Sequence, residues 1–106
     1  MNDDRAAGQA LLDELAAGLD GITRSPMFGS SGVRRNGQLL AFVGRAGDLV
    51  VRVPPDRAQD LLAGGRAREV RMGRGAAREW IGVPLPADGD PATWRELLEA
   101  AHAHAG

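Results

Sequence analysis

Two short turn signals within residues 24–53 constrain the fold of this chain more than any other feature. They are Asn36-Gly37 and the run Ala46-Gly47-Asp48, and apolar, β-favouring residues flank both. An Asn-Gly pair suits a tight hairpin because both central residues of that turn need a positive φ, which Asn and Gly tolerate. The pattern therefore predicts a meander of three short antiparallel strands, at about residues 27–34, 38–44 and 48–53.

The second and third of these strands differ in how their apolar residues are spaced. The run 39–43 is apolar throughout, which predicts a central strand covered on both faces. The third strand alternates instead. Its register predicts one packed face and one partly wet face, with Leu49, Val51 and Val53 on the first and Val50 and Arg52 on the second.

Three segments have the periodicity of amphipathic helices. Residues 4–20 place leucines at helical spacing, and Ser25-Pro26 makes continuation of that helix unfavourable. A short helix is expected after Pro54-Pro55, before Gly64-Gly65. The last helix is expected to begin at Pro91, with Asp90 as its cap and an apolar stripe made by Trp94, Leu97, Leu98 and Ala101.

Two further strands are expected at residues 67–72 and 77–83, around the turn Gly73-Arg74-Gly75. The element order is then α-β-β-β-α-β-β-α. Strands joined by hairpins pair antiparallel, so the prediction is an α+β fold with a five-stranded antiparallel sheet and helices packed on it. At 106 residues, the chain 1–106 is expected to form one domain.

The composition excludes several classes of protein and site. Without cysteine, the chain has no disulfide framework, thiol nucleophile or thiolate metal site, which favours a cytoplasmic protein. No apolar run approaches the roughly 20 residues that span a bilayer, so no membrane association is expected. The acidic start of the chain does not resemble a secretory signal.

Charge is distributed unevenly along the chain. Residues 1–23 carry five acids and one arginine, residues 24–78 carry eleven arginines and four acids, and residues 79–106 again carry five acids and one arginine. The predicted sheet is therefore basic and the two terminal helices are acidic. Every basic residue is an arginine, which is typical of a GC-rich genome, so the arginine count alone is weak support for nucleic-acid binding.

Several segments resemble the N-terminal domain of the TfoX/Sxy proteins over residues 10–103. The resemblance begins with Met27-Phe28-Gly29, continues through Asn36-Gly37 and residues 48–53, and ends with Arg78-Glu79-Trp80-Ile81-Gly82-Val83-Pro84. It also includes Arg57-Ala58, Leu61-Leu62-Ala63 and Gly73-Arg74.

The resemblance implies an antiparallel α+β domain similar to secretion-chaperone-like folds. Full-length members of the family regulate natural competence together with a cyclic-AMP-responsive transcription activator, and they carry a second, C-terminal domain that these residues do not include. The family supplies no catalytic residues. A non-enzymatic interaction module with a protein partner, acting as a transcriptional co-regulator, is therefore the first expectation.

Arginines on the predicted strands and turns are the candidate contact residues. Projected from one open face they would meet an acidic partner or phosphates, and the candidates are Arg34, Arg35, Arg45, Arg52, Arg74 and Arg78. A nucleic-acid-binding protein using this face is the alternative hypothesis. Against it, the chain has two Trp, two Phe and no Tyr to stack on bases, and no helix-turn-helix pattern. An exposed sheet edge is a second contact surface, and it would also allow a homodimer.

The remaining candidate sites are weaker. Gly29-Ser30-Ser31-Gly32 could cradle an anion, although an irregular first strand is favoured, and Met27 with Phe28 could line a ligand pocket, although a role in the core is favoured. His102 and His104 lack a third metal ligand and lie near the end of the chain, so no metal site is expected. No motif for a cofactor or a catalytic nucleophile is present, which makes an enzyme improbable.

Overall fold

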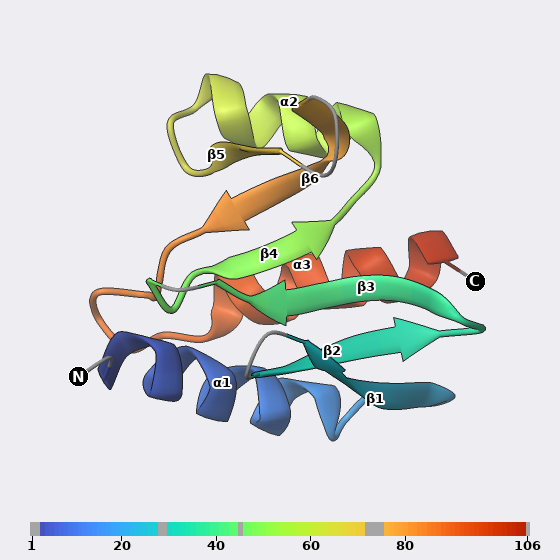
Figure 1. Ribbon diagram of the computed structural model, residues 1–106. Coiled ribbons are helices and arrows are strands. Elements are labelled where there is room, and N and C mark those ends of the chain that lie inside the picture. The colour runs from blue at the N-terminus through green and yellow to red at the C-terminus, as the bar shows by residue number, and fades with distance from the viewer. Residues whose placement is uncertain (1–2, 28–29, 45, 72–75, 106) are drawn as a thin grey trace.

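The computed structural model describes residues 3–27, 30–44, 46–71 and 76–105 (Figure 1). Its elements are α1 (Asp3–Ala16), β1 (Ile22–Met27), β2 (Ser30–Arg35), β3 (Gln38–Val43), β4 (Leu49–Arg52), α2 (Pro55–Ala63), β5 (Arg68–Arg71), β6 (Ala76–Val83) and α3 (Ala92–Ala105). The strands form one six-stranded sheet in the order β1-β2-β3-β4-β6-β5, and every neighbouring pair is antiparallel. The α+β class expected from the sequence is confirmed.

The sheet has one more strand than the sequence predicts. The segment Ile22–Met27 pairs with β2, in a register that sets Ile22 opposite Arg35 and Met27 opposite Ser30. The sequence pattern predicted a helix to residue 20 and a first strand at residues 27–34, whereas α1 ends at Ala16, β1 is Ile22–Met27 and β2 is Ser30–Arg35. Proline is tolerated in β1 because β1 is an edge strand, where one row of backbone groups has no partner to lose.

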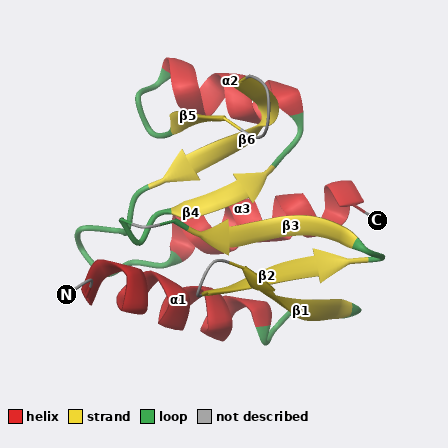
Figure 2. Cartoon of the chain, in the orientation of Figure 1, coloured by secondary structure: helices red, strands yellow, loops and turns green. Residues whose placement is uncertain are grey.

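Helices cover one face of the sheet. α1 and α3 contact each other and both contact β3, while α2 packs on β6. In Figure 1, α3 passes behind β3 and β4, and Figure 2 shows the same arrangement coloured by type of element. The ion pair between Arg57 of α2 and Glu96 of α3 joins these two helices, so the three helices form a single layer.

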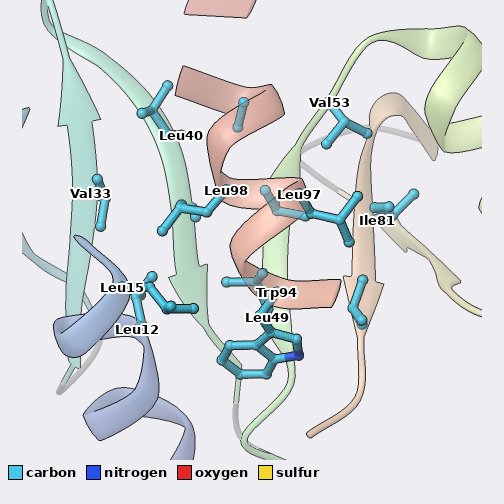
Figure 3. Close-up of a cluster of buried hydrophobic side chains, with 14 of the residues drawn as sticks. Leu12, Leu15, Val33, Leu40, Leu49, Val53, Ile81, Trp94, Leu97 and Leu98 are labelled. Carbon is cyan, nitrogen blue, oxygen red and sulfur yellow. The ribbon is translucent and has the colours of Figure 1, made fainter. Parts of the chain in front are cut away.

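The core lies between this helical layer and the sheet. Trp94, Leu97 and Leu98 of α3 are each 1% exposed and sit against strand residues that are fully buried (Figure 3). The Trp94 indole Nε1 donates a hydrogen bond to the carbonyl oxygen of Pro84, 2.9 Å away. Asp90 accepts from the amide of Ala92 at 3.0 Å, but α3 begins at Ala92 and the carbonyl oxygen of Pro91 accepts its first hydrogen bond, from Arg95. Asp90 therefore lies one residue before the cap position expected for it.

A β-bulge explains part of the apolar run 39–43. Val33 pairs with Ala41, whereas the next residue, Arg34, pairs with Leu39, so Leu40 is an extra residue on β3. Both Leu40 and Ala41 are fully buried, because a bulge lets two consecutive side chains turn toward the same face. The expectation that helices or other elements cover this strand on both faces was wrong, since the run combines inward residues 40, 41 and 43 with outward residues 39 and 42.

Two glycines allow α1 to lie directly on the turn between β3 and β4. A Cβ at Gly47 would fall on the carbonyl oxygen of Asp4, and a Cβ at Gly8 would fall on the carbonyl oxygen of Gly47. Gly47 also has φ +83°, a conformation that side chains disfavour. A glycine in the interior of a helix lowers its stability, so the close approach of the two backbones accounts for Gly8.

We expect Gly47→Ala to destabilise the protein by more than 2 kcal/mol, an order-of-magnitude figure for a positive φ combined with a steric clash. Gly65→Ala is the matched control, because Gly65 has φ +69° but no atom within 4 Å of the added Cβ. It should cost only about 1 kcal/mol. Urea unfolding of the two variants and the parent measures both values. Equal losses would show that α1 does not approach this turn as closely as described.

Candidate interaction surface

No helix of the described residues packs on the face of the sheet opposite the helical layer. Strand register identifies the side chains on that face, because directly paired residues point the same way. One row across the sheet is Phe42, Val50, Gly82 and Arg68. A second row is Thr23, Arg34 and Leu39. The third set is the pair Arg52 and Trp80. We call the positions in these three sets the uncovered face.

Apolar residues form the centre of the uncovered face. Val50 is 5% exposed but lies outside the core cluster on the helical side. The Phe42 and Trp80 rings lie beside it with their centroids 6.1 Å apart and their planes inclined at 49°. Phe42, Trp80 and Leu39 are half-buried and also do not belong to that core. They therefore form a small apolar strip that is separate from the main core.

The candidate arginines do not share one face. Arg34 is on the uncovered face, where it donates to the carbonyl oxygen of Gly37 in the adjoining turn at 3.2 Å. The next residue, Arg35, points to the helical side and donates to the carbonyl oxygen of His102 at 2.7 Å. Arg52 is bound to Glu79 at 3.0 Å. Arg45 and Arg74 lie outside the described residues, and the side chain of Arg78 in β6 is also outside the description.

Carboxylates neutralise many of the described arginines. Four ion pairs besides Arg52–Glu79 are present among the described residues, and one of these uses a histidine. The arginine pairs join different elements, namely Arg24 with Asp13, Arg57 with Glu96, and Arg68 with Asp48. Several arginines from the basic middle of the sequence are thus paired with carboxylates from its acidic ends.

Asp48 and Arg68 connect two strands that are not neighbours in the sheet. Asp48 directly precedes β4, Arg68 begins β5, and β6 lies between them. The Arg68 guanidinium reaches across Gly82 to Oδ2 of Asp48, and a Cβ at Gly82 would come within 3.0 Å of atoms of both residues. The Asp48 side chain is 5% exposed and that of Arg68 is 67% exposed. No pattern in the sequence indicates this pair, because only the sheet order brings the two residues together.

The described part of the glycine-rich segment 29–32 is residues 30–32, and it lies in strand β2. Ser31 lies in β2, and its amide donates to Oε1 of Gln9 in α1 at 3.1 Å. That amide is therefore engaged within the fold and does not face an anion. Phe28 and Gly29 lie outside the described residues, as does the side chain of Met27.

The two histidines near the end of α3 face different partners. His102 Nε2 is 2.7 Å from the carbonyl oxygen of Asp20, and its Nδ1 is 3.3 Å from Arg35. His104 Nε2 is 3.4 Å from Oε1 of Glu79. Within the described residues, no group of three His, Cys, Asp or Glu side chains is arranged to hold a metal ion. Both histidines connect α3 to other parts of the fold.

Two carboxyl groups have shifted pKa values. Partial burial would raise the pKa of Glu79, but hydrogen bonds from His104 and Arg52 outweigh it and hold the pKa below its ordinary value. The pKa of Asp13 is also lowered, because hydrogen bonds from Arg24 and Gln9 outweigh the effect of burial. The partners of Glu79 both belong to other elements, whereas those of Asp13 are Arg24 in β1 and Gln9 in the same helix, α1.

No protein-family model matches the chain, and no curated protein matches it. None of the helices in the described ranges is long and apolar enough to cross a bilayer.

A double-mutant cycle should show that Asp48 and Arg68 stabilise the fold together. For Asp48→Asn and Arg68→Gln we expect a coupling energy of about 1–2 kcal/mol, more than for an exposed pair because Asp48 is buried, and limited because Arg68 is largely solvated. The cycle Glu96→Gln with Arg57→Gln is the control, and this exposed pair should give at most about 0.5 kcal/mol. Denaturant unfolding measures both cycles. A coupling no larger than that of the control pair would contradict the structural role of Asp48.

Lowering the pH should destabilise the protein through Glu79 and Asp13. A carboxyl group whose pKa is depressed by folding contributes stability above its unfolded pKa, about 4.3 for Glu, and loses it as the pH falls through the folded pKa. We therefore expect the loss of stability in acid to be smaller in Glu79→Gln than in the parent. Unfolding free energies measured between about pH 6 and pH 3 test this. An equal loss of stability in acid for Glu79→Gln and the parent would contradict the role given to Glu79.

Proposed function

We propose that this chain is a non-enzymatic interaction module that binds a protein partner through the uncovered face of its sheet. The resemblance to the TfoX/Sxy N-terminal domain supports a role in transcription regulation, as a co-regulator acting by protein contacts. The observation that carries the proposal is the apolar strip of Leu39, Phe42, Val50 and Trp80, on a sheet face that no helix of the described part of the chain covers. Apolar side chains gathered on an open face mark interaction sites.

The sheet face is a better contact surface than the sheet edges. β1 contains Pro26, which has no amide hydrogen for an added strand. β5 has four residues and an irregular register with β6. Short, bulged or proline-containing edge strands discourage pairing with a further strand. The proposal therefore assigns binding to side chains of the face and not to backbone groups of an edge.

A protein partner agrees better with the surface than the alternative, a nucleic acid. Affinity for a polyanion depends on cations that can replace its counterions, and Arg52 and Arg68 are already paired with Glu79 and Asp48. Single-strand binders also stack bases on aromatic rings. The rings of Phe42 and Trp80 are inclined at 49° to one another and do not present a common plane.

Site-specific photocrosslinking tests the proposal. A photoreactive residue at Leu39, on the uncovered face, should capture a protein in cells, and the same residue at Glu14, on the exposed side of α1, should not. The captured protein is identified by mass spectrometry, and Phe42→Ala combined with Trp80→Ala should reduce its yield about tenfold. Capture at Glu14 alone, or capture of nucleic acid in place of protein at Leu39, would overturn the proposal.

A further inference from the structure

We infer that Asn36 is a site of spontaneous covalent modification, at which the side-chain amide becomes a carboxyl group when the β2–β3 hairpin opens. The reaction uses water and the backbone nitrogen of Gly37, so it needs no partner protein and no cofactor. No part of it depends on the proposed function. Three features of the molecule support it, namely the sequence of the turn, its geometry and its place in the sheet.

The chemistry is a displacement within the chain. The Gly37 nitrogen loses its proton and attacks Cγ of Asn36, which forms a C–N bond and closes a succinimide ring. The bond between Cγ and Nδ2 breaks, and the nitrogen leaves as ammonia. Water then opens the ring at one of its two carbonyls. The product is either aspartate or isoaspartate, in which the main chain passes through the side chain of residue 36. One water is consumed and one ammonia is released.

The Asn36-Gly37 pair is the favourable place for this reaction in the chain. Asparagine is one of the thermolabile residues, and glycine has no Cβ to hinder the attacking nitrogen. Both residues are exposed, and none of the turn and loop hydrogen bonds among the described residues uses the Gly37 amide. The one other asparagine in the sequence, Asn2, is followed by Asp3 and so lacks this advantage.

The closed turn keeps the two reacting atoms apart. Asn36 has φ 52° and Gly37 has φ 79°, and the pairing of Arg35 with Gln38 closes the loop. These values belong to the mirrored type I turn, in which ψ of the first central residue is about +30°. At that ψ, the next nitrogen lies nearly anti to Cβ about the Cα–C bond, whereas a five-membered ring needs the two almost eclipsed. The reaction therefore proceeds from the open turn.

Opening of this turn needs little rearrangement of the rest of the fold. Nothing lies within 4 Å of the position that a Cβ would take at Gly37, so the turn stands clear of other elements. The Arg34 guanidinium donates to the carbonyl oxygen of Gly37 at 3.2 Å and stabilises the closed form. Local openings of this kind cost less free energy than global unfolding. The rate in the folded protein is thus the rate of the open chain multiplied by the population of open turns.

The isoaspartyl product cannot form the same turn again. It adds one atom to the main chain between Cα of residue 36 and the nitrogen of Gly37, so the loop no longer fits the pairing of Arg35 with Gln38. Turn type and loop length fix the register of a hairpin. Because β2 and β3 carry the fully buried side chains Val33 and Leu40, a shifted hairpin also loses packing. Modification therefore converts a transient opening into a lasting loss of stability.

Ageing of the purified full chain in mildly alkaline buffer tests the inference. Trypsin cuts after Arg35 and Arg45 and releases residues 36–45 as one peptide. Mass spectrometry detects replacement of the amide by an acid in this peptide, and chromatography separates the two products. The site should convert at least about tenfold more slowly in the folded protein than in the protein kept in denaturing urea. Arg34→Gln should raise the rate about twofold in buffer and leave it unchanged in urea.

Asn36→Gly is the matched control, because Gly-Gly suits the same turn and lacks the reacting side chain. After ageing, the isoaspartyl fraction of the parent should unfold at a lower urea concentration than fresh protein, whereas aged Asn36→Gly should be unchanged. Equal rates in buffer and urea, or no conversion in urea, would contradict the inference, and so would an isoaspartyl form as stable as the parent. The comparison of buffer with urea uses the parent alone, so it remains decisive if a variant fails to fold.

Discussion

The structure depends on the burial of one face of a six-stranded sheet by all three helices. α3 supplies the largest part of this contact, because Trp94, Leu97 and Leu98 are almost fully buried against the central strands. Full burial of each such side chain contributes roughly 1.5–3 kcal/mol. The hydrogen bond from Trp94 to Pro84 fixes the indole at the start of α3, beside the chain that leaves β6. One-sided burial holds the fold together, and among the described residues it leaves the opposite face without a helix.

Much of this architecture follows from local sequence. The turn at Asn36-Gly37 has the expected positive φ at both residues, 52° and 79°, and the alternation of Leu49, Val51 and Val53 places three fully buried residues on the core side. β1 was missed because a proline argues against a strand unless the strand lies at an edge, and edge position is a property of the assembled sheet. The bulge at Leu40 was missed for a similar reason, since a bulge depends on the partner strand.

The candidate surface was only partly predictable. The sequence identified the arginines, but it could not show which of them are paired, because pairing depends on contacts between distant segments. Arg34 and Arg35 are adjacent in sequence and point to opposite faces, which β alternation explains once the strand is located. The pairing of Arg68 with Asp48 needed the order β4-β6-β5, in which a strand later in sequence separates two earlier segments. The Phe42–Trp80 contact depends on the same order.

That strand order also bears on how the domain can change during evolution. β6 pairs directly with β4, and the amide of Val53 donates to the carbonyl oxygen of Glu79. α2 and β5, which lie between β4 and β6 in the sequence, are therefore placed at one edge of the sheet. Insertions or deletions in the segment between β4 and β6 would alter this edge of the sheet and leave the register of β1 to β4 intact. Because Ala58 and Leu61 of α2 are part of the core, we expect changes in length there to fall in the turn at residues 64–67, between α2 and β5.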